Sequence, residues 1–154
     1  MATHADIRID VRSDPRLLKS VRGLVRAYLE SCGVPARRVD DAVLAVDEAC
    51  ANAMRHSYNG DKNQRISLRL RPYAAGIEIV LRDQGVTAPP EAVARKPVVP
   101  PDRQTVKPGG RGIQILYEVF DEVVFRPGRI AGNQVTMRLA HPREPHPSQS
   151  GPPT

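Results

Sequence analysis

Three glycines and an arginine, Gly109-Gly110-Arg111-Gly112, stand directly before a helical pattern that begins at Ile113. Free backbone N–H groups and the positive end of the helix dipole meet at a helix start, and both attract phosphate. Arg111 adds a fixed charge that can hold phosphate oxygens. The segment lacks the Gly-Lys-Ser/Thr of a Walker A loop, and it does not follow a strand as a Rossmann glycine motif does. It predicts either a phosphate-binding helix start or a hinge.

A second chemical group is the carboxylate of Asp83, which ends the alternating segment GIEIVLRD, residues 76–83. Side chains two positions apart share one face of a strand, so Asp83 joins Ile79 and Leu81 on the face expected to be buried. A buried carboxylate must find a hydrogen-bond donor or become protonated. Gly85, two residues later, allows a backbone turn or the close approach of a flat ligand. Asp83 therefore belongs either to a binding site or to a cap for the loop that follows.

The third group is the pair Glu48 and Asn52, one helical turn apart in DEACANAMRHSY, residues 47–58. At about 100° per residue, Val46 and Cys50 lie on an apolar stripe and Glu48 lies nearly opposite. That arrangement fits a polar face turned toward water. Asparagine is a poor helix-interior residue, however, and the neighbours of Glu48 are short and largely apolar, which favours a site. The helix alone leaves both interpretations open.

The scaffold that positions these groups can be predicted from hydrophobic periodicity. Ser13-Asp14-Pro15 is typical of a helix start, and Gly33 stands where a helix C-cap belongs. Six prolines between residues 84 and 110 exclude long regular elements, so this stretch is predicted to be a lid. The predicted elements are a strand at 7–12, helices at 13–33 and 34–56, a loop at 57–64, strands at 66–73 and 76–83, the lid at 84–110, a helix at 113–120, and strands at 121–127 and 133–139.

Length and composition indicate one domain, since 154 residues with 40% apolar side chains can build a core. We expect the domain at 1–139 and a disordered tail at 140–154, which is rich in proline and serine. Cys32 and Cys50 match no disulfide or zinc pattern. The N-terminus has no signal-peptide h-region, and no apolar run reaches the length of a membrane span, so a cytoplasmic protein without a membrane partner is expected.

The chain is basic, with a net charge of +6 and an isoelectric point near 9.8. Its arginines are scattered and form no basic run, and only two Phe and four Tyr are available to stack on bases. Direct nucleic-acid binding is therefore not predicted. A basic surface suited to an acidic partner or to ATP fits better. His141 and His146 are metal-ligand residue types, but their proline-flanked positions favour solvated side chains.

The three groups in this order are more specific than any one of them. Glu-x-x-x-Asn on a helix, Asp-x-Gly after a strand and Gly-x-Gly before a helix resemble the Bergerat fold of the gyrase and histidine-kinase (GHKL) ATPase superfamily. The segments DEACANAMRHSY, LRDQG and GGRGI resemble the anti-sigma factor serine kinases, over about residues 6–139. This resemblance implies an α+β fold, a two-layer α/β sandwich whose mixed, mostly antiparallel sheet carries about three helices on one face.

The resemblance also implies ATP and Mg²⁺ as cofactors and gives roles to the residues of the helix. Asn52 would hold Mg²⁺ among the ATP phosphates. Glu48 would be the catalytic base that orients or deprotonates an attacking serine hydroxyl. A positioned base of this kind contributes roughly 10²–10⁴ in rate, so a chain with both residues is expected to be a competent kinase.

The roles implied for the other two groups concern the nucleotide. Asp83 would accept a hydrogen bond from the adenine amino group, and Gly85 would let the ring lie close. Gly110 and Gly112 would present N–H groups to the phosphates, with Arg111 as our own addition to the phosphate contacts. In the last turn, Gly132 is followed by Asn133-Gln134 and not by the threonine often found there in the family, so no nucleotide contact is predicted from that position.

The partners implied are a sigma factor, which the protein would sequester, and a STAS-type anti-anti-sigma protein, whose serine it would phosphorylate. An alternative is an ATP-binding interaction regulator without kinase activity. A fragment of a histidine kinase is a third interpretation, but it needs a dimerising helix pair for which residues before 6 or after 139 leave no room. A homodimer is implied by the resemblance alone, because the arginines of the outer strand 7–12 discourage edge-to-edge pairing.

Overall fold

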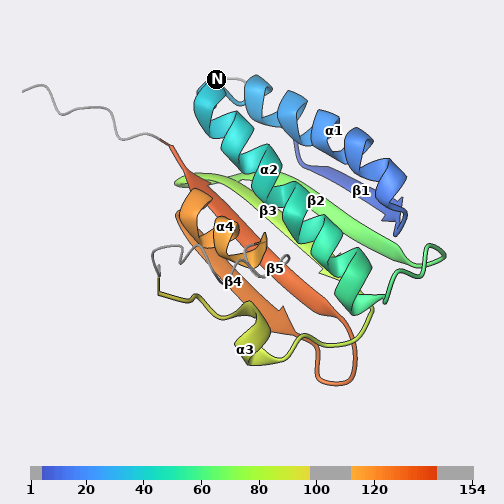
Figure 1. The fold of residues 1–154 in the computed structure, drawn as a ribbon. Helices are drawn as coiled ribbons and strands as arrows, with labels where there is room; N and C mark the ends of the chain where they lie inside the picture. Colours follow the sequence, from blue (N-terminus) through green and yellow to red (C-terminus); the bar gives the residue numbers. More distant parts are fainter. Residues whose placement is uncertain (1–4, 98–111, 142–154) are drawn as a thin grey trace, which may run out of the picture.

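The computed structural model describes residues 5–97 and 112–141, which form a five-stranded sheet in the order β1-β2-β3-β5-β4 (Figure 1). All pairings between these strands are antiparallel, so a sheet expected to be mostly antiparallel is wholly so in the described part of the chain. The strands are β1 (Ile7–Arg12), β2 (Arg65–Tyr73), β3 (Gly76–Asp83), β4 (Glu122–Pro127) and β5 (Asn133–Ala140).

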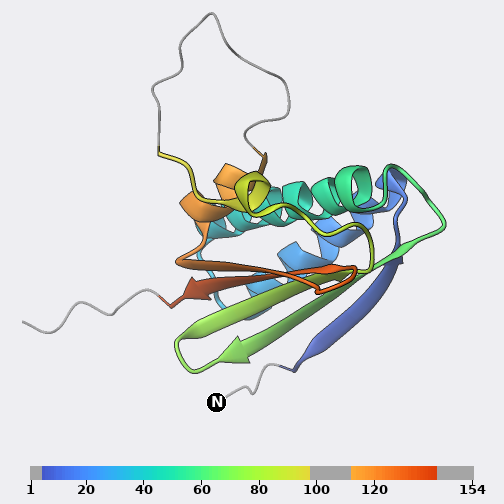
Figure 2. The same cartoon turned by 90° about the horizontal axis from the view of Figure 1, so that it is seen from below.

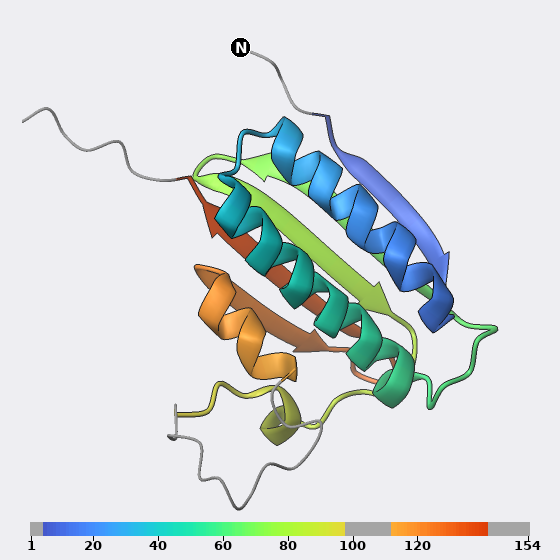
Figure 3. The same cartoon turned by 45° about the horizontal axis from the view of Figure 1, so that its top comes forward.

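Three main helices cover one face of this sheet and leave the other face bare, as the edge-on view in Figure 2 shows. They are α1 (Leu18–Ser31), α2 (Ala36–Asn52) and α4 (Gly112–Val119). Figure 3 shows α1 and α2 side by side over the sheet, with α4 next to α2. The two-layer sandwich with three helices on one face is therefore confirmed. None of the described helices is long and apolar enough to cross a bilayer.

The first helix begins and ends where local chemistry predicts. Asp14 accepts a hydrogen bond from the Arg16 N–H at 3.0 Å and caps a short 3-10 turn (η1, Pro15–Leu17) that leads into α1. At the other end Gly33 has a φ of 77°, a left-handed conformation that favours glycine. The N–H of Val34 then bonds to the Leu29 carbonyl, which closes the helix.

The second helix ends differently from the prediction. After Asn52 the chain makes a π turn (η2, Ala53–Ser57), in which the Tyr58 N–H bonds to the Ala53 carbonyl at 3.2 Å. Ser57 is thus the last helical residue, although it was expected in the following loop. The wider turn leaves Ser57 buried, with its hydroxyl directed to Asp83.

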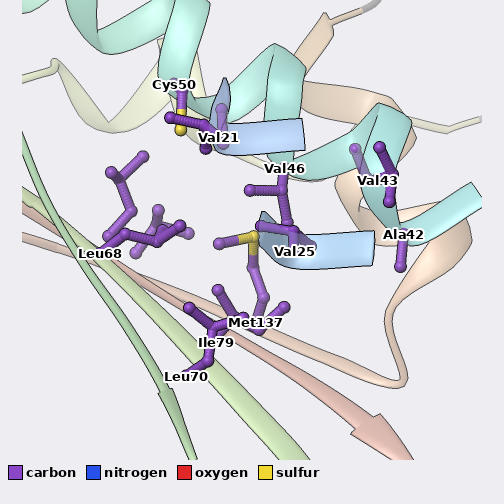
Figure 4. Close-up of a cluster of buried hydrophobic side chains, with 14 of the residues drawn as sticks. Val21, Val25, Ala42, Val43, Val46, Cys50, Leu68, Leu70, Ile79 and Met137 are labelled. Atoms are coloured by element: carbon purple, nitrogen blue, oxygen red, sulfur yellow. The ribbon is translucent and has the colours of Figure 1, made fainter. Parts of the chain in front are cut away.

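The hydrophobic core lies between the helices and the sheet. Val25 of α1 and Val46 of α2 pack above Leu70, Ile79 and Met137 of the strands (Figure 4). The predicted stripe of α2 is buried, namely Val43, Val46, Cys50 and Ala53. Burial raises the pKa of the Cys50 thiol to about 12, so this side chain packs as a small apolar group. The core therefore holds the inner face of α2 against the sheet.

The predicted end of the last strand needs correction. Ala140, expected to open a disordered tail, is the last residue of β5 and pairs with Gly76, and the His141 N–H bonds to the Ala75 carbonyl at 2.8 Å. A backbone partner across the sheet extends the strand beyond its apolar pattern. The predicted lid contains one short helix in its described part, α3 (Pro90–Val93), which agrees with the exclusion of long regular elements there. Residues 98–110 of that lid and 142–154 of the tail lie outside the described residues.

Candidate functional site

Two of the predicted site residues, Asn52 and Asp83, line one cavity. Residues from α2, the π turn, β3, the segment around α3, the start of α4 and both last strands line it: Ala49, Asn52, Ala53, Ser57, Leu81, Asp83, Ala88, Val93, Ile113, Phe125, Arg126, Pro127, Asn133, Gln134 and Val135. Residues as far apart in the sequence as Ala49 and Val135 therefore contribute to a single hollow.

Asp83 is buried at one side of this cavity, with 6% of its surface exposed. Its Oδ2 accepts a hydrogen bond from the Ser57 hydroxyl at 3.1 Å. Its Oδ1 accepts from the Gly85 N–H at 3.0 Å and from the Asn133 amide, also at 3.0 Å. The expectation that a carboxylate on this face must find donors is confirmed. Because three donors face it, the carboxylate is held in one orientation.

Glu48 lies against the start of α4. A Cβ added to Gly112 would stand 2.7 Å from the Glu48 Oε2, so a side chain here would push the Glu48 carboxylate out of its present position. The Glu48 side chain is 35% exposed, and its Oε2 lies 4.0 Å from the Arg55 guanidinium, a weak ion pair at this distance and exposure. The polar face of α2 is therefore not simply a solvated surface, since it packs against a second helix start.

Asn52 is the last residue of α2 and lines the cavity together with Asp83. It is half-buried, and its side-chain amide forms no hydrogen bond with another described residue. An amide in this position is available to a ligand in the cavity. Gly112 is the first residue of α4, while Gly110 and Arg111 lie outside the described residues, so their predicted phosphate contacts stay predictions.

Gly85 answers a question that the sequence left open. A Cβ on this residue would overlap the carbonyl group of Ser57, and the next N–H, that of Val86, bonds to the same carbonyl at 2.8 Å. The close approach is therefore between the end of β3 and the π turn. A glycine is required for this backbone contact, whatever the cavity binds.

Three residues at the site were not predicted from the sequence. Ser57 was assigned to a loop, and Asn133 was given no ligand contact although its amide bonds to Asp83. Tyr58 is buried beneath the same strand end, where its hydroxyl accepts from the Gln84 N–H at 2.7 Å and donates to the Arg65 carbonyl at 2.6 Å. Burial raises the pKa of Tyr58, so the hydroxyl stays protonated and can donate. A serine in the π turn and the tyrosine that follows it carry no periodic signal that would reveal these contacts.

The sequence profile of the histidine kinase-like ATPase domain matches residues 11–139, which include α1, α2, strands β2 to β4, β5 up to Leu139 and every described site residue. The chain belongs to this family. Its two-layer architecture and the convergence of α2, β3 and α4 are thus features of a histidine kinase-like ATPase domain.

Named members of the family are similar over most of their length. The chain is 27% identical over 127 residues to the serine-protein kinase RsbW of Bacillus subtilis, covering 80% of this chain and 79% of the relative. It is also 27% identical over 124 residues to the anti-sigma F factor of Geobacillus stearothermophilus, covering 78% and 82%.

Solved structures share the fold. The SiaB-SiaC complex of Pseudomonas aeruginosa superposes with a TM-score of 0.63 at 12% identity, over 85% of this chain and 87% of the solved chain. The RsbU and RsbW domains of a Mycobacterium tuberculosis protein give 0.62 at 19% identity, over 90% of this chain and 33% of that longer chain. At these identities the similarity concerns the histidine kinase-like ATPase fold alone.

Proposed function

We propose that this chain is an ATP-dependent protein serine kinase that also acts as an anti-sigma factor. The observation that carries the proposal is the position of Glu48, which lies against Gly112 at the mouth of α4 and one helical turn from Asn52. A candidate base thus stands beside the helix start where phosphate would bind. The relatives named as a serine-protein kinase and an anti-sigma factor support the same function.

The adenine ring would be recognised at the other side of the cavity. Asp83 is buried, oriented by three donors and open toward the hollow, so it can accept a hydrogen bond from the exocyclic amino group. The surrounding Leu81, Val93 and Phe125 supply apolar surface for a flat ring. In this proposal Gly85 lets the ring approach the backbone as well as allowing the Ser57 contact.

The triphosphate would lie between α2 and α4. Gly112 and Gly110 would present backbone N–H groups to it, and Arg111 would add a guanidinium. Asn52 would hold Mg²⁺ through its amide oxygen, a hard ligand of the kind this ion takes. When bound, Mg²⁺ neutralises part of the charge on the phosphate oxygens.

Glu48 would act on the phosphoacceptor. In the transfer, the serine Oγ forms a bond to the γ-phosphorus while the bond from that phosphorus to the β,γ-bridging oxygen breaks, releasing ADP. The serine proton passes to the Glu48 carboxylate, which is partly exposed and so reachable by a protein substrate. A base of this kind contributes roughly 10²–10⁴ in rate.

The phosphoacceptor in this proposal is a serine of a STAS-type anti-anti-sigma protein, and the sequestered partner is a sigma factor. Both come from the resemblance and from the names of the relatives. The proposal includes a homodimer, which the resemblance implies, and action in the cytoplasm, which was expected from the N-terminal sequence. The net charge of +6 suits partners with acidic surfaces.

The experiment is phosphoryl transfer from γ-labelled ATP with Mg²⁺ to STAS proteins from the same genome, with Glu48→Gln as the decisive variant. We expect a labelled serine with the parent chain and a loss of about 10²–10⁴ in rate for E48Q, while calorimetry shows ATP still bound. Exposed Glu30→Gln in α1 serves as the matched control. ATP uptake without transfer by the parent would favour the non-catalytic regulator, and equal rates for parent and E48Q would remove Glu48 from the mechanism.

A further inference from the structure

The side chain of Asn133, the first residue of β5, joins two parts of the site. Its Nδ2 donates to the Asp83 Oδ1 at 3.0 Å and lies 3.1 Å from the Ser57 Oγ. The same nitrogen lies 2.9 Å from the Val86 carbonyl oxygen, and the Asn133 Oδ1 accepts from the Ala88 N–H at 2.7 Å. One amide thus contacts the buried carboxylate and the chain that leaves β3.

The orientation of this amide is determined by its neighbours. Three acceptors face the Asn133 nitrogen, and one N–H donor, that of Ala88, faces the oxygen. A flipped amide would direct its oxygen at acceptors and its nitrogen at a donor. A threonine or serine at this position has a single O–H donor and could not donate to Asp83 and to the Val86 carbonyl at once.

The amide holds the segment 86–88 as a neighbouring strand would. It pairs with the carbonyl of Val86 and the N–H two residues later, that of Ala88. Gln114 of α4 repeats the arrangement farther along, with its Nε2 on the Ala94 carbonyl at 3.0 Å and its Oε1 on the Lys96 N–H at 2.9 Å. The chain from 86 to 96 is therefore attached to β5 at one end and to α4 at the other.

The same contacts set how many acceptor positions Asp83 keeps for a ligand. A carboxylate offers about four lone-pair positions, two on each oxygen. The Gly85 N–H and the Asn133 amide occupy both positions on Oδ1, and the Ser57 hydroxyl occupies one on Oδ2. One position on Oδ2 remains. A single fixed acceptor suits the 6-amino group of adenine and opposes the 6-oxo group of guanine.

We propose that Asn133 is a positioning residue that makes the site selective for adenine and couples base binding to the segment 86–88. This inference rests on the proposed function, because it assumes that Asp83 recognises the base. Without the Asn133 amide, Asp83 regains an acceptor position and can turn toward the N1–H and 2-amino donors of guanine. At the same time residues 86–88 lose both side-chain bonds to β5.

The test measures dissociation constants for ATP and GTP by calorimetry in the parent, Asn133→Ala, Asn133→Asp and a control, Thr136→Val. Thr136 lies on the same strand, on the face away from the helices, and valine keeps its shape. We expect N133A to weaken ATP binding about tenfold and to narrow the ratio of ATP to GTP affinity about tenfold, while T136V leaves both unchanged. Amide hydrogen exchange at 86–88 should become faster in N133A and should no longer slow when ATP binds.

Asn133→Asp keeps the size of the side chain and an oxygen that can accept from the Ala88 N–H. This variant therefore still tests the proposal if N133A fails to fold. It places a second carboxylate beside Asp83, and a proton shared by the pair can replace the lost donor. ATP affinity of N133D, relative to the parent in the same buffers, should rise as the pH falls. A purely structural residue would show no such profile.

The outcomes separate the two proposals. A parent chain that binds no ATP at millimolar Mg²⁺ would refute the proposed function. The inference would be refuted if the parent binds ATP but both Asn133 variants keep the parent's ratio of ATP to GTP affinity and its pH profile. That result would leave the proposed function standing.

Discussion

The Glu48 Oε2 and Gly112 lie so close that a Cβ on the glycine would stand 2.7 Å from the carboxylate oxygen. Glu48 lies within α2, one turn before its end, and Gly112 begins α4, sixty-four positions later. Because the obstacle would be the end of a side chain and not backbone, an alanine at 112 is accommodated only by moving the carboxylate. This contact links the fold directly to the proposed catalytic geometry.

Gly112→Ala should therefore lower the rate of phosphoryl transfer about 10- to 100-fold while the protein stays folded, since a small misplacement of a base is enough. Gly23→Ala is the matched control, because nothing lies within 4 Å of a Cβ there. That variant should keep full activity and gain up to about 1 kcal/mol of stability from helix propensity. Steady-state kinetics with a STAS substrate, together with thermal unfolding, check both. An unchanged turnover rate in G112A would mean that phosphoryl transfer does not depend on the present position of the Glu48 carboxylate.

Asp83→Asn should abolish most nucleotide binding. The new amide nitrogen would face one of the present donors, Ser57, Gly85 or Asn133, and it would offer a donor where adenine also offers one. An unsatisfied buried group costs about 1–3 kcal/mol, which corresponds to roughly 5- to 150-fold in ATP affinity. Calorimetry measures the affinity, and exposed Asp10→Asn on β1 is the control. If D83N bound ATP as tightly as the parent, Asp83 would not be the residue that recognises the adenine ring.

Glu78 is expected to make stability depend on pH. It lies on the face of the sheet away from the helices yet is 2% exposed, because Arg71 and Arg138 bond to its two oxygens at 2.7 and 2.8 Å. Burial alone would raise the pKa of Glu78, but the hydrogen bonds from the two arginines outweigh it and hold the pKa below its ordinary value of 4.5. Because the pKa of Glu78 is lower in the folded chain than in the unfolded chain, the ionised carboxylate stabilises the fold at pH values above the unfolded-state pKa.

That stabilisation is complete above about pH 4.5 and should be lost as the pH falls through the lowered pKa of Glu78. Glu78→Gln should cost about 3 kcal/mol of unfolding free energy at pH 7, since it removes the partner of two arginines at a buried position. The unfolding free energy of E78Q should also fall less on acidification than that of the parent. Urea unfolding at pH 7 and pH 4 measures both effects. Glu122→Gln, at a side chain 51% exposed, should change stability by less than about 1 kcal/mol.

The two cysteines should differ in reactivity. Cys50 is fully buried, and burial raises the pKa of its thiol to about 12, so almost none of the reactive thiolate forms at pH 8. Cys32 is only partly buried at the end of α1. A thiol reagent should therefore label Cys32 in the folded protein and both cysteines after unfolding. Rapid labelling of Cys50 under native conditions would show that the core beneath α2 opens readily.

Much of the fold follows from local chemistry that the sequence displays. The cap at Asp14 and the left-handed Gly33 bound the first helix where their residue types predict. Alternation along β3 places Asp83 on the buried face, and helical spacing places Glu48 and Asn52 on the same side of α2. These properties depend on backbone conformation and on neighbours a few positions away in the sequence. Sequence patterns predict interactions over such short separations.

The tertiary structure decided what those residues touch. Asp83 meets Asn133 because β3 pairs with β5 in a register that sets these two residues opposite each other, fifty positions apart. It meets Ser57 because a π turn, invisible to periodicity, keeps that residue helical. Glu78, which alternation assigns to solvent, is buried by arginines from two neighbouring strands. Such contacts depend on strand order, register and the space left between layers, and all of these are settled only when the whole chain packs.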